Sequence, residues 1–341
     1  MNGMMPAALE RVDRLYDKTP VIDGAQASEF TPRYMREVRD AGVTATLVTV
    51  AWNHSADEAM ARIADWRERI ERNGDVALFG ASSSSIARAK AEGKVAYWLA
   101  FQNAEPLEGD VRLVDAYWKL GVKIVQLTYN GRNALGCGCR CEPDRGLTAF
   151  GRRVIARMND LGMLVDLSHV GDRTAAETIA LADHPVFSHA NARAVCDNVR
   201  NKPDELLEAV ADKDGIVGIN AFPAFVRRTR TERGERPTLD DLLVHIDYLI
   251  ELIGEDHVGI GLDLIENTGK EEFELLASDP EMWGLPDPSG GYRYPEGIDS
   301  VRDLRNIARG MAAGGHGDGR IRKVLGGNWL RVLRETDGSE R

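Results

Sequence analysis

Short apolar runs rich in β-branched residues alternate along the chain with longer amphipathic segments. Eight of these runs have the length and composition of buried strands. They are Val21–Asp23, Thr44–Val50, Val95–Phe101, Lys123–Tyr129, Leu164–Ser168, Val186–Ser188, Ile216–Asn220 and Val258–Leu262. Helices are predicted between them, and several of these segments end in glycine, which is frequent just beyond a helix. The alternation predicts repeated βα units.

Eight strand–helix units predict a (β/α)8 barrel, an α/β fold whose active site lies at the carboxyl ends of the strands. A doubly wound open sheet is the alternative, but no GxGxxG or P-loop pattern follows the first strand. No linker-like tract divides the chain, so we predict one domain over residues 1–341.

A long segment at about 264–298 is rich in aromatic residues, proline and glycine. A segment of this length and composition between a strand and a helix suits a lid-like insertion that folds across the site. Trp283, Tyr292 and Tyr294 are its candidate pocket residues, and packing of the segment on itself is the alternative.

The composition excludes several classes of partner. The chain has 341 residues, 43% of them hydrophobic, and a formal net charge of -11. This acidic balance argues against nucleic acid and against an anionic membrane surface, since both bind basic faces. The first residues lack the pattern of a signal peptide, and no stretch approaches 18 consecutive apolar residues. We therefore expect a cytoplasmic protein that acts on a small molecule.

Two of the predicted strands end in the same dipeptide, Ser-His. His169 follows LVDLS and His189 follows PVFS, and Asp263 comes directly after the last predicted strand. Because parallel strands of a barrel end at one mouth, these three side chains are expected to converge. Two imidazoles and a carboxylate can hold a divalent ion with an open position for water. The alternative is a pair of hydrogen-bonded histidines without a metal.

Three of the four cysteines lie in the segment GCGCRCE, as Cys137, Cys139 and Cys141. Alternate residues of an extended segment point to opposite sides, so one ion cannot collect all three thiolates without a bend. We expect reduced, unpaired thiols. A soft-metal or redox role, or thiolate help to a neighbouring site, are the alternatives.

Five blocks of the chain resemble the membrane (renal-type) dipeptidases, peptidase family M19 of the amidohydrolase-like metal hydrolases. The resemblance runs from about Val21 to Leu333. It is densest in KLGVKIVQLTYNGRN, RGLTAFGRRVIARMNDLGMLVDLSHV, PVFSHANARAVCDNVRNKPDE, DHVGIGLD and VLGGNWLRVL. It implies a barrel with two zinc ions, bridged by a glutamate, that hydrolyses dipeptides with a free carboxylate end.

Four positions keep the residues of this family. By the resemblance, His169 and His189 match the histidines that hold the second metal, and Asp263 matches the general base. Arg200 matches the arginine that grips the substrate carboxylate, a role that suits its bidentate fork.

Four other positions depart from the family, and three of them concern the first metal. The family's His-x-Asp motif after Asp-Gly is replaced by Ala25 and Ala27. The bridging glutamate falls on Gln102, and Tyr129 stands where the family has a histidine that touches the substrate carbonyl. Alanine offers no ligand atom and a neutral amide is a poor bridge, so the paired-zinc mechanism is not assigned to this chain.

A mononuclear site is therefore expected, with one zinc or another divalent ion at His169 and His189, or no ion at all. Its third ligand would be Asp263, Gln102, His54, Glu142 or a thiolate of the cysteine segment, and Glu105 is a candidate replacement for the bridge. We assign catalysis to Asp263, Tyr129 and Gln102, and substrate binding to Arg200, Tyr129 and Asn130.

Three functions are open on these residues. The first is a dipeptidase-like metallohydrolase of a dipeptide or similar small amide. The second is a metal-independent acid–base enzyme on a carboxylate-bearing metabolite, and the third is a non-catalytic pocket protein. A homodimer is compatible with each of them.

Overall fold

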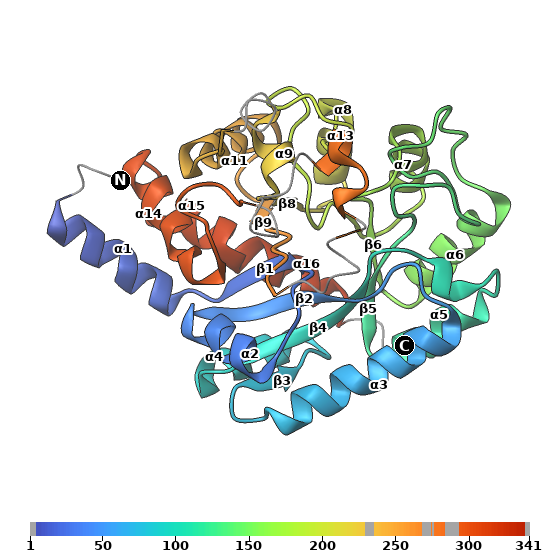
Figure 1. Cartoon of the computed structure of the whole chain (residues 1–341), viewed down its shortest axis with the longest axis horizontal. Helices are drawn as coiled ribbons and strands as arrows, with labels where there is room; N and C mark the ends of the chain where they lie inside the picture. Colours follow the sequence, from blue (N-terminus) through green and yellow to red (C-terminus); the bar gives the residue numbers. More distant parts are fainter. Residues whose placement is uncertain (1–4, 229–234, 268–273, 275, 284–292, 338–341) are drawn as a thin grey trace.

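The strands form a parallel ring that confirms the predicted barrel (Figure 1). The computed structural model describes residues 5–228, 235–267, 274, 276–283 and 293–337. Its strands are β1 Val21–Gln26, β2 Val43–Ala51, β3 Ala77–Phe79, β4 Val95–Phe101, β5 Val122–Gln126, β6 Leu164–Asp166, β7 Pro185–Val186, β8 Val217–Ile219 and β9 Val258–Ile260. The order is β7-β6-β5-β4-β2-β1-β9-β8, and a parallel bridge from Phe187 to Val217 joins its two ends.

One strand, β3, was not predicted from the sequence. It contributes only Ala77, Leu78 and Phe79, which pair with the first half of β4 at Val95–Tyr97. Strand β5 pairs with β4 only from Leu99 onward. Strands β3 and β5 therefore share one edge of β4. Strand β3 was not predicted because its three residues, none of them β-branched, carry too weak a pattern to indicate a strand.

Helices cover the outside of the ring, and the helices expected between the predicted strands are confirmed, among them α2, α3, α5, α6, α7, α8 and α11. The helices are α1 Pro6–Lys18, α2 Pro32–Asp40, α3 Ala56–Arg72, α4 Ser83–Glu92, α5 Arg112–Lys119, α6 Ala149–Asp160, α7 Asp172–Ile179, α8 Asp204–Ala211, α9 Pro223–Val226, α11 Leu239–Ile253, α13 Pro280–Trp283, α14 Arg305–Ala313, α15 Asp318–Arg322 and α16 Asn328–Glu335. Helix α3 starts with a capping box of Ser55 and Glu58, which fixes its first turn beside the end of β2. Within the described residues, no helix could cross a lipid bilayer.

Two tryptophans fill the inside of the barrel. Trp98 from β4 and Trp329 from α16 are fully buried in one cluster with small and aliphatic side chains of the strands. The indole N–H of Trp329 donates to the carbonyl of Ile260 at 2.8 Å. This interior is a packed core, so a ligand site is left only at the mouth formed by the carboxyl ends of the strands.

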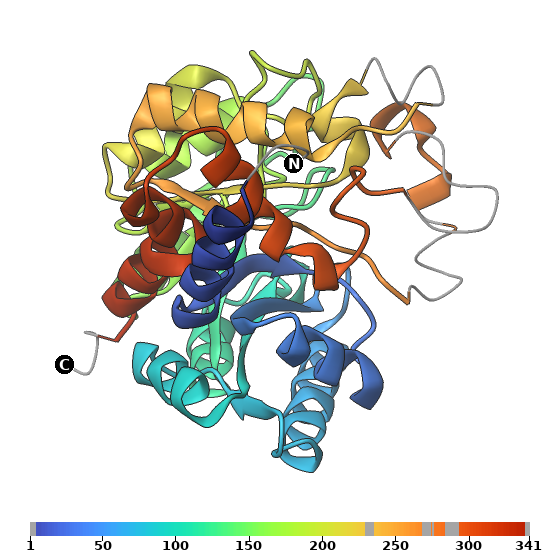
Figure 2. The same cartoon turned by 90° about the vertical axis from the view of Figure 1, so that its left-hand side faces the viewer.

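Part of the predicted lid-like insertion at 264–298 is described, including α13 at one side of the barrel (Figure 2). Trp283 and Tyr294 are buried, with 5% and 4% of their surface exposed. Trp283 packs edge-on against Phe222, which follows β8. Tyr292 lies outside the described residues, and the action of the segment as a lid stays a prediction.

Candidate active site

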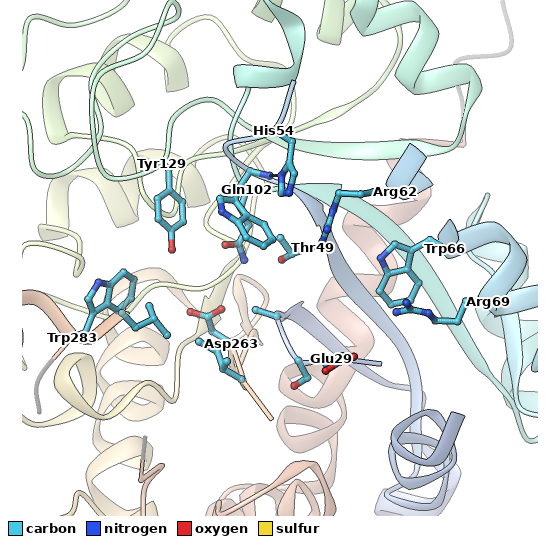
Figure 3. A pocket seen from close by; sticks show the side chains of 15 residues that line it. Glu29, Thr49, His54, Arg62, Trp66, Arg69, Gln102, Tyr129, Asp263 and Trp283 are labelled. Carbon is cyan, nitrogen blue, oxygen red and sulfur yellow. Dashed lines mark hydrogen bonds between the residues drawn. The ribbon is translucent and has the colours of Figure 1, made fainter. Parts of the chain in front are cut away.

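A cavity of about 630 Å³ opens at the mouth of the barrel. Ala27, Gln102, Tyr129 and Asp263 line it, and they follow strands β1, β4, β5 and β9. In Figure 3 the hydroxyl of Tyr129 and the amide of Gln102 point toward the carboxylate of Asp263. The three residues assigned to catalysis from the sequence therefore share one end of one cavity.

The carboxylate of Asp263 is held by an unusual backbone. Its φ of 54° lies in the left-handed region, which non-glycine residues seldom occupy. The amide N–H donates to the carbonyl of Ala25 at 3.0 Å, and the carbonyl accepts the hydroxyl proton of Tyr294 at 2.6 Å. Backbone in this region persists only when its surroundings fix it, and it is frequent at functional sites. Here it aims the side chain at the cavity.

Burial raises the pKa of Asp263 to about 6. The positive charge of Arg200 and a hydrogen bond of 3.3 Å from the Asn220 amide oppose this rise. A second carboxyl in the same region, Asp23 of β1, is fully buried, and burial raises its pKa to about 7. Asp263 is thus ionised at neutral pH but more basic than an exposed aspartate, which suits a general base.

His169 and His189 meet as predicted, but they meet each other. Their Nε2 atoms lie 3.0 Å apart. The Nδ1 of His169 lies 2.6 Å from Oδ1 of Asn130, and the Nδ1 of His189 lies 2.7 Å from Oγ of Ser188. Burial, followed by the positive charge of Arg200, holds the pKa of both histidines well below the ordinary value. Both rings are therefore neutral at neutral pH.

The repeated Ser-His dipeptide has a structural explanation in Asp166. Its carboxylate accepts the hydroxyl protons of Ser168 at 2.7 Å and Ser188 at 2.5 Å, and also both backbone N–H groups. One buried acid thus fixes the ends of two neighbouring strands. The histidine that follows each serine is positioned by this network.

The aromatic ring of Tyr129 lies between the histidine pair and the cavity. It stacks on His169 with ring centroids 4.2 Å apart and planes inclined by 20°. Tyr129 belongs to the cavity wall, whereas neither histidine is among the described residues that line it. With 1% and 0% of their surface exposed, the imidazoles lie behind the tyrosine.

Arg200 and Asn130, both assigned to substrate binding, lie away from the described cavity wall. Arg200 is 1% exposed, and its guanidinium donates to the backbone carbonyls of Ser168 and His189. The amide of Asn130 is used by His169 and by the thiol of Cys139, whose Sγ lies 3.6 Å away. A role of either residue toward a substrate stays a prediction.

The other candidate ligands are dispersed. His54 lines the cavity, where its Nδ1 accepts the N–H of Trp52. Glu105 is exposed and lines a second cavity of about 460 Å³ next to the first. Glu142 is exposed too, and it lines a third, smaller cavity beside Cys139.

The four cysteines are free thiols, as the sequence predicts. Burial raises the pKa of Cys139 above its ordinary value. Burial and the neighbouring Cys137 raise that of Cys141 to about 11. Neither of these two thiols is therefore a thiolate at neutral pH.

The match to known proteins decides the family. A family model described as membrane dipeptidase, peptidase family M19, matches residues 9–274. The chain belongs to this family. An uncharacterised dipeptidase of Schizosaccharomyces pombe is 31% identical over 270 residues, which are 78% of this chain and 59% of that relative. Dipeptidase aclJ of Aspergillus oryzae is 32% identical over 248 residues, 72% and 52% of the two lengths. The chain thus aligns with less than two thirds of each.

Two solved structures share the barrel. An amidohydrolase from Pseudomonas aeruginosa superposes with a TM-score of 0.87 at 32% identity, over 95% of this chain and 98% of that one. A metallo peptidase from Rhodobacter sphaeroides, solved with a phosphinate mimic of the dipeptide L-Ala-D-Ala, gives 0.76 at 22% identity, over 93% and 99%. The second likeness extends to the fold alone.

The membrane dipeptidase family implies a divalent metal, and the donor atoms of this chain do not fit one. Ala25 and Ala27 carry no ligand atom, and Gln102 offers a neutral amide. Over the described ranges of the chain, no three His, Cys, Asp or Glu side chains are grouped so that they could hold an ion. His169 and His189 supply two nitrogens, one fewer than the three protein ligands of a catalytic zinc site. Among the described residues, the expected single-ion site therefore lacks a third His, Cys, Asp or Glu ligand.

The sequence analysis missed the wall of the cavity opposite Asp263. Arg62, Trp66 and Arg69 of α3 line it together with Trp52, which follows β2 (Figure 3). The spacing of Arg62, Trp66 and Arg69 in the sequence does indicate this wall, since residues at i, i+4 and i+7 lie on one face of a helix.

Proposed function

We propose that this member of the membrane dipeptidase family binds a dipeptide, or a similarly small amide with a free carboxylate, and hydrolyses it without a metal. The observation that carries the proposal is the convergence of Asp263, Gln102 and Tyr129 at one end of a cavity whose metal-ligand positions hold alanines and an amide. The names of the relatives support the substrate class, since two are dipeptidases and a solved one holds a dipeptide mimic.

In this proposal Asp263 is the base. Its carboxylate takes a proton from water while the water oxygen bonds to the amide carbon. The side-chain N–H of Gln102 and the O–H of Tyr129 donate to the carbonyl oxygen as it becomes negative. The C–N bond then breaks, and the proton held by Asp263 passes to the departing amine. The products are a carboxylic acid and an amine, so every atom of the amide and the water is accounted for.

The environment of Asp263 suits both halves of this cycle. A carboxyl with a pKa of about 6 accepts a proton from water more readily than an exposed aspartate does, and it can still return that proton near neutral pH. The nearby histidines lie against each other behind Tyr129, and in this proposal they support the tyrosine ring.

The test is hydrolysis measured with and without a chelator. Protein purified without added metal is analysed for zinc, manganese, iron and cobalt, and is then given a panel of L,L- and L,D-dipeptides with release of free amino acid followed by mass spectrometry. We expect turnover that survives EDTA and is lost in Asp263→Asn. Asp65→Asn, an exposed acid on α3, is the matched control.

Two outcomes would refute the proposal. Turnover that EDTA abolishes and zinc restores would show that the hydrolysis depends on a metal. Ligand-induced stabilisation without any product would make it a binding protein on the same barrel.

A further inference from the structure

The cavity has a cationic, aromatic end that the proposed chemistry does not use. Arg62 and Arg69 reach it from α3, and Trp52 and Trp66 lie beside them (Figure 3). Among the described residues of the cavity wall, these two arginines are the permanently charged cations. They lie across the cavity from the carboxylate of Asp263.

Each guanidinium lies over an indole. The Cζ of Arg62 is 5.3 Å from the ring centroid of Trp52, and that of Arg69 is 5.0 Å from the ring centroid of Trp66. The Nε–H of Arg62 also donates to the carbonyl of Val50 at 2.5 Å. Stacking restricts the planes of both guanidinium groups before a ligand arrives, and the hydrogen bond to Val50 further restricts that of Arg62. A planar fork held in this way binds a carboxylate with little further loss of side-chain freedom.

The buried arginine that the family resemblance assigns to the substrate carboxylate is held elsewhere. Arg200 donates to two backbone carbonyls, and its guanidinium lies 5.2 Å from the ring centroid of Phe225. A carboxylate in the cavity would therefore meet the α3 arginines first. The rim also carries one acid, the exposed Glu29, which makes the cavity unfavourable for a polyanion.

We propose that Arg62 and Arg69 bind the carboxylate of the ligand, and that Trp52 and Trp66 bind a large apolar or aromatic group next to it. The application to a dipeptide rests on the function proposed above. The subsite then selects a dipeptide whose C-terminal residue is aromatic or bulky and has a free carboxylate. The scissile amide of the dipeptide then faces Asp263.

The first experiment needs no hydrolysis. Binding of 3-phenylpropionate and of its uncharged analogue 3-phenylpropanamide is measured by calorimetry up to about 10 mM, a range that detects millimolar affinity. We expect the acid to bind about tenfold or more tightly than the amide, as a charge-assisted bond to a guanidinium predicts. Arg69→Gln and Arg62→Lys should reduce this preference to about twofold or less, since one loses the charge and the other the fork.

A matched control removes the same charge from the same helix. Arg72→Gln lies on the exposed side of α3, where Arg72 pairs with Glu68, and it should keep the full preference for the acid. Circular dichroism and melting temperature verify the fold of each variant. An unchanged preference in both Arg69→Gln and Arg62→Lys would overturn the proposal, and so would a wild type that binds neither probe or both equally.

A second experiment separates this proposal from the proposed function. The KM and kcat for L-Ala-L-Phe are compared in the wild type and in Arg69→Gln, and we expect about a tenfold rise in KM with kcat nearly constant. Hydrolysis with an unchanged KM would refute the arginine subsite alone. A preserved acid preference without any hydrolysis would refute the proposed reaction and leave the subsite intact.

Discussion

The ring of Tyr129 lies flat on the ring of His169, with their centroids 4.2 Å apart. One face of the tyrosine is thereby committed to the buried histidine pair, while its hydroxyl faces the cavity and Asp263. The buried pair of imidazoles thus contacts the wall of the cavity through the tyrosine. This relationship separates the contribution of the Tyr129 hydroxyl from that of its ring.

Tyr129→Phe removes the hydroxyl and leaves the stacked ring. Loss of one donor to a developing oxyanion lowers kcat by about 100-fold or more. We expect this loss with a melting temperature within about 2 °C of the wild type, because the packing is preserved. Steady-state kinetics and a thermal melt check it, and Tyr248→Phe on α11 is the control. Full activity in Tyr129→Phe would remove the tyrosine from the mechanism.

Asp263→Asn keeps the size of the side chain and abolishes its basicity. Removal of a general base lowers kcat by about 100- to 10,000-fold, and we expect a loss in this range. In the wild type, kcat/KM should fall as the pH drops through about 6, because the protonated carboxyl can no longer accept a proton. A pH–rate profile that is flat from pH 5 to 8 would contradict this assignment.

Much of the barrel could be predicted because each strand and helix carries its own period. Helix α3 was recognised from its amphipathic pattern, and the ends of β6 and β7 from their apolar runs. Strand β3 was missed because three residues cannot establish a period of two. Local patterns thus fix the elements, while their lengths and edges depend on the neighbours with which they pair.

The site was harder to predict because side-chain direction is set by contacts far away in the chain. The histidines at 169 and 189 do approach each other, with their Nε2 atoms 3.0 Å apart, but they lie behind Tyr129 and are not among the described residues that line the cavity. Arg200 donates from its two terminal nitrogens to the backbone carbonyls of Ser168 and His189, and its role toward a ligand stays a prediction. The spacing of these residues along the sequence does not reveal where the imidazoles and the guanidinium point. Both directions follow from the packing of several strands at one mouth of the barrel.

A buried histidine outside the site makes stability depend on pH. Burial lowers the pKa of His245 on α11 to about 4, below the ordinary 6.5. The unfolded chain therefore binds the proton more tightly, so this group's contribution to stability is complete above pH 6.5 and is lost as the pH falls toward 4. A shift of this size corresponds to about 3 kcal/mol.

His245→Gln tests this linkage, because its amide can still donate to the carbonyl of Val226, which His245 contacts at 3.1 Å. Between pH 7 and pH 4.5, the free energy of unfolding should fall less in the variant than in the wild type, by about 2 to 3 kcal/mol. Urea unfolding at the two pH values measures the difference. A half-buried histidine, His184, provides the control in His184→Gln, and equal pH dependence in wild type and His245→Gln would contradict the prediction.

Strand β1 lies so close to the barrel core at Gly24 that adding one methyl group there should have a large effect on stability. A Cβ at Gly24 would lie 2.2 Å from Cζ2 of Trp329 and 2.9 Å from the carbonyl oxygen of Ser188. Because that indole is fully buried, Gly24→Ala should destabilise the fold by about 1 to 3 kcal/mol. Gly319→Ala on α15, where no atom lies within 4 Å of the new Cβ, should be neutral or stabilising by up to about 1 kcal/mol. Denaturant titration of both variants decides it.

The donor set predicts how the chain responds to metal. With alanines at 25 and 27 and an amide at 102, the wild type should keep well below one equivalent of zinc after dialysis, and its melting temperature should not rise with added zinc. Ala25→His, Ala27→Asp and Gln102→Glu together supply the three ligand side chains that the family resemblance expects.

The triple variant should retain at least one equivalent of zinc, because a histidine and two carboxylates add donors beside the existing imidazole pair. Zinc at about 100 times its Kd would then stabilise the fold by about 2.7 kcal/mol. The same three substitutions in a His169→Ala background are the control and should bind zinc more weakly, since one imidazole is gone. Stoichiometric metal that survives dialysis in the wild type would show that a ligand set exists outside the residues considered above. Metal analysis together with melting curves separates these outcomes without any assay of activity.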